Sequence, residues 1–214
     1  MPPDMVLFDC DGVLVDSEPL TAEVLRKSLA GHGLPLSRHD LDEMFLGGTI
    51  MGLADTARQM GAQLPASWID DIYEEIFAVL GARVEVIDGI WQVLDALDGA
   101  GVAYAVGSNG PHRKMQVTLG RTGLIDRFHG RVYSREDVAS PKPAPDVYLR
   151  AASDAGIAPV RCVVIEDSPN GARAGVAAGM QVFGFAAETP AARLDPVCDR
   201  VFARMRDLPA LLGL

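Results

Sequence analysis

The 214-residue chain is 49% hydrophobic and 22% charged, a composition that suits a globular protein with a sizeable buried core. Its formal net charge of −10 argues against nucleic acid as a partner, and no apolar run is long enough to span a membrane. The three cysteines are far apart and form no CxxC pair, and the first residues lack the pattern of a secretory signal, so we expect a protein of the reducing cytoplasm without disulfides or a zinc site.

The first predicted strand is followed by a long helical region. Residues 5–8 form a wholly apolar run, which is typical of a buried strand. From about residue 19 to residue 80 the sequence has helical periodicity and no convincing strand. Glycines separate four successive helical segments, at residues 19–33, 38–48, 50–61 and 67–81. We therefore predict that residues 17–83 form a helical insertion.

Beyond this insertion the chain alternates helices with apolar runs. The sequence predicts, in order, a helix at residues 89–101, a strand at 102–107, a helix at 145–156, a strand at 162–165, a helix at 168–180 and a strand at 181–185. Apolar runs without polar alternation suit a parallel sheet that helices cover on both faces. We therefore predict an α/β fold, with a Rossmann-like, doubly wound parallel sheet in a core domain of residues 1–16 and 84–214.

Several common catalytic motifs are absent from the sequence. It contains no GxxxxGK[ST] loop and no GxGxxG after the first strand, which argues against a P-loop enzyme and a dinucleotide-binding protein. The segment 106–110, VGSNG, has Val106 where a GxSxG nucleophile turn needs glycine. The four histidines show no close spacing of the kind that metal sites use.

Polar side chains follow three of the predicted strands. They are Asp9 and Asp11 after the first strand, Ser108 and Asn109 after the strand at 102–107, and Glu166 and Asp167 after the strand at 162–165. Because ligands bind outside the carboxyl ends of strands in an open parallel sheet, we expect these residues to converge. The proline-rich segment SPKPAPD adds Lys142. The sequence thus predicts an acidic pocket with one fixed cation.

The carboxylates of such a pocket would repel one another. Two unit charges about 4 Å apart repel by roughly 4 kcal/mol at an effective dielectric constant of 20. Asp9, Asp11 and Asp167 therefore predict a hard divalent cation with oxygen ligands, and Mg²⁺ fits best. The metal, Lys142, the Ser108 hydroxyl and loop N–H groups could together hold a phosphate dianion beside the carboxylates.

Cys10 lies between the two aspartates of the first strand end. Alternation along a strand sends its side chain to the face opposite that of Asp9. An apolar surrounding and two neighbouring carboxylates would raise the pKa of the thiol, which is the wrong direction for a nucleophile. We therefore predict that Cys10 packs in the core and takes no part in catalysis.

Four motifs together resemble the haloacid dehalogenase-like superfamily. They are the DxDG of FDCDGVLVDS, the serine of VGSNG, the lysine of SPKPAPD and the acidic pair of VIEDS. Their order also agrees, and the resemblance covers essentially the whole chain. The helical insertion is similar to the cap domain of the branch that contains β-phosphoglucomutases and small phosphatases. The resemblance implies that residues 17–83 open to admit substrate and close to exclude water, with hinges near Asp16 and Arg83.

The resemblance also implies a role for each site residue. Asp9 would be the nucleophile that forms an aspartyl-phosphate, and Asp11 would protonate the leaving alcohol and then act as base towards water. Ser108 and Lys142 would hold the oxygens of the transferred phosphoryl group. True dehalogenases lack the second aspartate because a halide leaving group needs no proton, so Asp11 points to phosphoryl transfer.

The same resemblance implies the metal ligands. Asp9, the main-chain carbonyl of Asp11, and Asp167 would coordinate Mg²⁺. Glu166 would lie near the ion and act on it directly or through water. The substrate contacts that we expect are Asn109 in the core and Gly47, Gly48 and Thr49 in the cap, where these three residues either close over the substrate or form a turn between helices.

Two positions favour a phosphatase over a mutase. Thr21 stands where β-phosphoglucomutases typically carry histidine, and Ile50 stands where their cap loop usually carries arginine. We therefore predict a monomer or weak homodimer that hydrolyses a small phosphorylated metabolite, similar to bacterial sugar-phosphate phosphatases. The alternatives are a sugar phosphate mutase and a non-enzymatic binding protein for a phosphorylated ligand.

Overall fold

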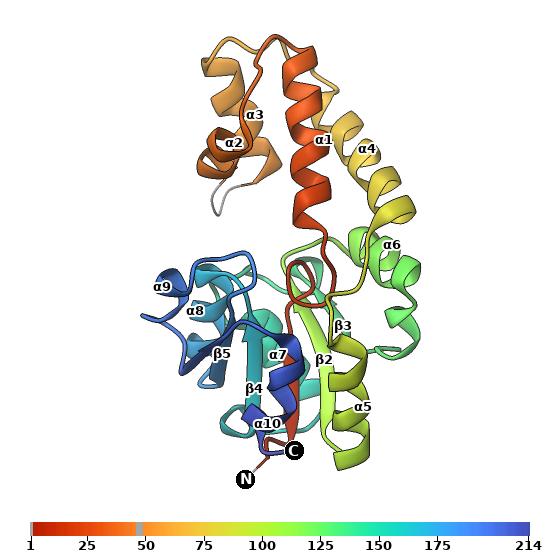
Figure 1. Cartoon of the computed structure of the whole chain (residues 1–214), viewed down its shortest axis with the longest axis vertical. Coiled ribbons are helices and arrows are strands. Elements are labelled where there is room, and N and C mark those ends of the chain that lie inside the picture. Colours follow the sequence, from red (N-terminus) through yellow and green to blue (C-terminus); the bar gives the residue numbers. More distant parts are fainter. Residues whose placement is uncertain (1, 46–48) are drawn as a thin grey trace. The chain divides into compact units, whose positions relative to one another are not determined.

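The computed structural model describes residues 2–45 and 49–214 (Figure 1). The chain divides into two compact units, one formed by the residues up to Asp16 together with Glu85–Leu214 and the other by Ser17–Val84. No helix in these described ranges combines the length and the apolarity that crossing a membrane requires. The larger unit is the α/β unit, and the smaller one consists of helices.

A parallel sheet forms the centre of the α/β unit. Within the described residues its strands are β1 (Met5–Phe8), β2 (Ala103–Ser108), β3 (Val132–Ser134), β4 (Cys162–Glu166), β5 (Gln181–Phe185) and β6 (Arg200–Phe202). Their spatial order is β3-β2-β1-β4-β5-β6, and every neighbouring pair is parallel. The predicted doubly wound α/β fold is therefore confirmed. The order reverses between β1 and β4, the point at which such sheets bind ligands.

Two strands, β3 and β6, were not expected from the sequence. Each has three residues and lies at an edge of the sheet. Arg200 in β6 is exposed, and Val132 and Tyr133 in β3 are only half-buried. Edge strands of this length carry too few apolar residues to form a run, so the periodicity could not reveal them.

Helices cover both faces of the sheet. The helices of this unit are α5 (Ile90–Ala100), α6 (His112–Thr122), α7 (Asp146–Asp154), α8 (Pro169–Ala177), α9 (Ala191–Leu194) and α10 (Leu208–Leu212). Ser168 caps α8, because its hydroxyl accepts a hydrogen bond from the Gly171 N–H at 3.1 Å. Helices α6, α9 and α10 are additions to the predicted set.

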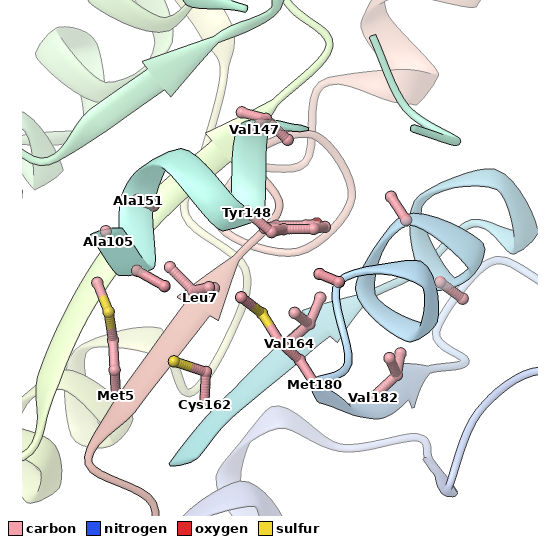
Figure 2. Close-up of a cluster of buried hydrophobic side chains, with 14 residues drawn as sticks. Met5, Leu7, Ala105, Val147, Tyr148, Ala151, Cys162, Val164, Met180 and Val182 are labelled. Carbon is pink, nitrogen blue, oxygen red and sulfur yellow. The ribbon is translucent and has the colours of Figure 1, made fainter. Parts of the chain in front are cut away.

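Alternate side chains of the strands pack on opposite faces. Figure 2 shows one face, where Met5, Leu7 and Val164 lie among side chains of α7 and α8. On the other face the rings of Phe8 and Tyr104 meet Phe128 edge to face, with centroids 6.3 and 5.3 Å away. Full burial of each such side chain contributes about 1.5–3 kcal/mol, so the central strands and their carboxyl ends are firmly placed.

Within its described residues the smaller unit contains four helices. They are α1 (Glu18–Gly31), α2 (Arg38–Phe45), α3 (Ile50–Gln59) and α4 (Trp68–Arg83). Helices α1 and α4 pack together, and the buried indole of Trp68 donates a hydrogen bond to the Ser28 hydroxyl at 2.9 Å. The unit therefore has an apolar core of its own, which includes Trp68, Leu25 and Leu80.

Candidate active site

The predicted site residues lie at the carboxyl ends of β1, β2 and β4. Asp9 follows β1, and its N–H donates to the Ile165 carbonyl of β4 at 3.0 Å. Ser108 is the last residue of β2, and Glu166 is the last residue of β4. The parallel ladder thus brings Asp9 together with side chains that are about a hundred and more residues away in the chain.

Lys142 lies between two of the carboxylates. Its ammonium group is 2.6 Å from Asp9 Oδ1 and 2.6 Å from Glu166 Oε1, and the three side chains are only 4%, 13% and 1% exposed. The same ammonium lies 4.5 Å from the ring centroid of Tyr148. The Tyr148 hydroxyl donates to Glu166 Oε1 at 2.8 Å. Lys142 is therefore held by two ion pairs and an aromatic face, away from bulk water.

Burial and charge shift the pKa values of this group. Burial raises the pKa of Asp9 to about 7, and the neighbouring carboxylates of Glu166 and Asp11 add to this rise while Lys142 opposes it. Burial alone would lower the pKa of Lys142, but Asp9 and Glu166 outweigh that effect and raise it to about 12. The lysine is thus a permanent cation, whereas Asp9 retains its proton up to about neutral pH in the metal-free protein.

Three carboxylates are close enough to share a metal ion. Among the described residues, Asp9, Glu166 and Asp167 each offer an oxygen atom within 4.8 Å of the others. Carboxylate oxygens are the donors that Mg²⁺ prefers, so the donor set fits the predicted ion. The Asp11 side chain is outside this group, while its predicted ligand atom is the main-chain carbonyl.

Two glycines make room for the acidic side chains. A Cβ atom at Gly12, where φ is +74°, would overlap Asp167 Oδ2, and one at Gly171 would overlap the Glu166 carboxylate. Gly12 is the glycine of the DxDG motif, and Gly171 is in the first turn of α8. Only glycine therefore lets both carboxylates reach the edge of the sheet.

Ser108 and Asn109 organise the loop after β2. The buried Ser108 hydroxyl accepts a hydrogen bond from the Gly110 N–H at 2.9 Å. Asn109 Oδ1 accepts from the Lys142 N–H at 2.8 Å, and its Nδ2 donates to the Lys142 carbonyl at 3.0 Å. Asn109 thus clamps the backbone of Lys142, a positioning role that the sequence did not reveal. Its contact with substrate stays a prediction.

Lys114 is a second cation of the site that sequence reasoning missed. It lies in the first turn of α6, and its ammonium group is 2.8 Å from Asp11 Oδ1. Burial alone would lower the pKa of Lys114, but the charge and hydrogen bond of Asp11, together with Cys10 and Asp9, outweigh that effect and raise it. Nothing in the segment PHRKM marks this lysine, since its contact with Asp11 arises from the packing of α6 beside the loop that follows β1.

Cys10 is buried among apolar side chains. Its Sγ lies 3.9 Å from the Thr118 hydroxyl. Burial raises the pKa of the thiol well above its ordinary value, and Asp11 and Asp9 raise it further. The expected direction of this shift is confirmed, and it suits a packing residue.

Three of the predicted substrate contacts belong to the smaller unit. Gly47 and Gly48 lie outside the described residues. Thr49 is exposed and caps α3, since its hydroxyl accepts a hydrogen bond from the Gly52 N–H at 3.0 Å. A contact of Thr49 with substrate stays a prediction.

The parallel sheet, the carboxylates at its edge and their lysines define a hydrolase of the type that the motifs indicate. Residues 3–179 match the family model of the haloacid dehalogenase-like hydrolases, and the chain belongs to this family. Among curated proteins, it is 29% identical to the 6-phosphogluconate phosphatase of Escherichia coli K12 over 187 residues, which is 86% of this chain and 83% of that protein. It is 30% identical over 185 residues to a putative phosphatase of Bacillus subtilis, covering 82% of this chain and 80% of that one.

Solved structures agree with this assignment. A HAD family hydrolase from Deinococcus radiodurans R1, with bound phosphate and sodium, has a TM-score of 0.85 and 36% identity, covering 99% of this chain and 96% of that one. A conserved haloacid dehalogenase-like protein from Agrobacterium tumefaciens C58 has a TM-score of 0.86 and 33% identity, with 98% and 97% covered. The resemblance therefore spans both units of the chain.

Proposed function

We propose that this chain is a Mg²⁺-dependent phosphatase that hydrolyses a small phosphate monoester, a sugar or sugar-acid phosphate, through an aspartyl-phosphate on Asp9. One observation carries the proposal: Asp9, with Lys142 at 2.6 Å, lies at the same sheet edge as the second aspartate, Asp11, and its lysine. Asp11 supports phosphoryl transfer over dehalogenation, because a proton donor is needed only when the leaving group is an alcohol.

The carboxylates of Asp9, Glu166 and Asp167 would hold the metal, together with the main-chain carbonyl of Asp11. Their oxygens lie within 4.8 Å of one another, which supports this assignment. When bound, Mg²⁺ offsets the negative charge of the carboxylates and of the phosphoryl oxygens. Lys142 and the Ser108 hydroxyl would hold the phosphoryl group against Asp9.

In the first step Asp9 acts as the nucleophile. One of its carboxylate oxygens forms a bond to phosphorus while the bond between phosphorus and the ester oxygen breaks. Asp11 gives its proton to that ester oxygen, so the leaving group departs as a neutral alcohol. The product of this step is an aspartyl-phosphate and an ionised Asp11.

In the second step water replaces Asp9 on phosphorus. Asp11 accepts a proton from the attacking water, whose oxygen forms a bond to phosphorus as the acyl-phosphate bond breaks. Asp9 leaves as a carboxylate and phosphate is released. Both aspartates then return to their starting protonation states, so one water is consumed for each ester that is cleaved.

The relatives and two positions of the helical unit support a phosphatase over a mutase. The 6-phosphogluconate phosphatase of Escherichia coli is similar over most of the chain, which supports a sugar or sugar-acid phosphate as the substrate. The Thr21 hydroxyl bonds the Ser17 carbonyl within its own helix at 2.9 Å. Ile50 has a buried, apolar side chain, so it offers no hydrogen-bond donor or charge to a second phosphate. We assign residues 17–83 the role of the cap, with hinges near Asp16 and Arg83.

The test is phosphate release from p-nitrophenyl phosphate with and without Mg²⁺. Wild type should turn over only with the metal, and Asp9→Asn should lose all measurable turnover while its circular dichroism stays unchanged. Asp98→Asn, which removes an exposed carboxylate of α5, is the matched control and should keep full activity. Full activity in Asp9→Asn would contradict the mechanism. A sugar 1-phosphate that is isomerised without phosphate release would instead establish a mutase.

A further inference from the structure

The acidic residues of the site are divided between two lysines. Lys142 contacts Asp9 and Glu166, at 2.6 Å each. Lys114 contacts Asp11 Oδ1 at 2.8 Å, and these two side chains are 19% and 21% exposed. Each cation therefore belongs to a different part of the proposed chemistry: Lys142 to the nucleophile and the metal ligands, Lys114 to the acid–base residue.

The start of α6, where Lys114 lies, is anchored to the end of β3. The His112 N–H donates to Glu136 Oε2 at 2.9 Å, and the Ser134 hydroxyl donates to the Gly110 carbonyl at 2.7 Å. These bonds fix the loop between β2 and α6 and with it the backbone of Lys114. The ammonium group therefore belongs to a helix turn whose backbone is held by hydrogen bonds, and not to a free surface segment.

Gly110 lets the lysine stem, the aspartate and Ser108 come together. A Cβ atom at this glycine would lie 3.3 Å from Ser108 Oγ, and 3.7 Å from both Asp11 Oδ2 and Lys114 Cδ. The three side chains thus surround one backbone position without a side chain of its own. The Asp11 carboxylate and Ser108, a predicted phosphoryl contact, thus flank the same backbone position. Asp11 is outside the group of carboxylates that could share a metal ion.

A charge at the Lys114 position has a definite physical effect on Asp11. Asp9, Glu166 and Asp167 carry like charges at the same sheet edge, and each favours an orientation of Asp11 that points away from them. A proton donor must stay within hydrogen-bond reach of the ester oxygen, which that repulsion alone does not ensure. An ion pair at 2.8 Å fixes one orientation of the carboxylate.

We propose that Lys114 is a positioning residue, which holds Oδ1 of Asp11 and so directs the other carboxyl oxygen, the one that carries the proton in the first step, towards the leaving group. The inference rests on the proposed function and deepens it. The contact of Lys114 with the site is its ion pair with the Asp11 side chain, so we assign its contribution to rate to Asp11. Its loss must therefore matter most for esters whose leaving group needs a proton.

Two aryl phosphates separate this role from a structural one. Phenolate is a stronger base than p-nitrophenolate, so phenyl phosphate depends on a proton donor and p-nitrophenyl phosphate scarcely does. Lys114→Met should lower kcat/KM for phenyl phosphate at least about tenfold more than for p-nitrophenyl phosphate, since general acid catalysis is worth 10²–10⁴. Lys114→Arg should restore most of the difference. Arg121→Met changes an exposed residue at the far end of α6 and should leave kcat/KM for both substrates unchanged.

Equal losses of kcat/KM on the two esters, or no loss on either, would overturn the proposal. Crystal structures of wild type and Lys114→Met give a second readout that needs no turnover. The Asp11 carboxylate should change its orientation in the variant, and an unmoved carboxylate would overturn the proposal. If wild type hydrolyses neither ester, the proposed function fails, and the crystal structures still decide whether Lys114 sets the orientation of Asp11.

Discussion

Asp9→Asn changes how the metal-free protein responds to pH. Burial holds the pKa of Asp9 at about 7 in the folded state, whereas an unfolded aspartate ionises near pH 4. Between these values the folded state retains a proton that the unfolded state has released. The free energy of unfolding therefore falls as pH rises, by about 1.4 kcal/mol per pH unit from this group.

The expected effect follows from that slope. From about pH 5 to about pH 7 wild type should lose about 2–3 kcal/mol of stability through Asp9, and Asp9→Asn should not. The side chain is only 13% exposed, so solvent screens little of this effect. The asparagine variant should thus gain stability relative to wild type as the pH rises.

Urea denaturation of both proteins in a metal chelator measures the difference directly. Unfolding curves at the two pH values give the four free energies, and slopes that match between variants show that the same transition is compared. The free energy of unfolding of Asp9→Asn relative to that of wild type should rise with pH. A relative value that stays constant across this range, or that falls as pH rises, would refute the reasoning about Asp9. Titration of groups far from Asp9 cancels in the comparison.

Three further substitutions test single contacts. Cys10→Ala should keep most turnover, and a loss beyond about a hundredfold would restore the thiol as a catalytic group. Gly171→Ala should weaken Mg²⁺ binding in calorimetry by at least about tenfold, because its methyl group would displace Glu166; Gly120→Ala, with open space around it, is the control and should bind Mg²⁺ normally. Tyr148→Phe removes a hydrogen bond to a buried carboxylate and should lower the free energy of unfolding by about 1.5–3 kcal/mol, whereas an unchanged urea midpoint would contradict that role.

The central part of the fold was predictable because its strands are apolar throughout. β1, β2, β4 and β5 are buried on both faces, so their sequences read as continuous apolar runs. Helix α6 escaped prediction because its exposed face is strongly polar and only Met115, Thr118 and Leu119 are buried. A short edge strand or a polar helix owes its place to tertiary packing, which no local pattern records.

The same distinction applies to the site. Asp9, Ser108 and Glu166 stand at strand ends, where topology alone predicts that they converge. Lys114 and Tyr148 lie on helices, and their contacts with carboxylates depend on how α6 and α7 dock on the sheet. Such contacts join residues from different elements, and the sequence gives no spacing from which to infer them.

The covalent phosphorylation of Asp9 tests the account most directly. Wild type mixed with p-nitrophenyl phosphate and Mg²⁺ is quenched in acid within a single turnover, digested and mapped by mass spectrometry. The peptide that contains Asp9 should carry one phosphoryl group in wild type and none in Asp9→Asn. Turnover without any phosphorylated peptide, or a phosphoryl group on another residue such as Cys10, would contradict the proposed mechanism.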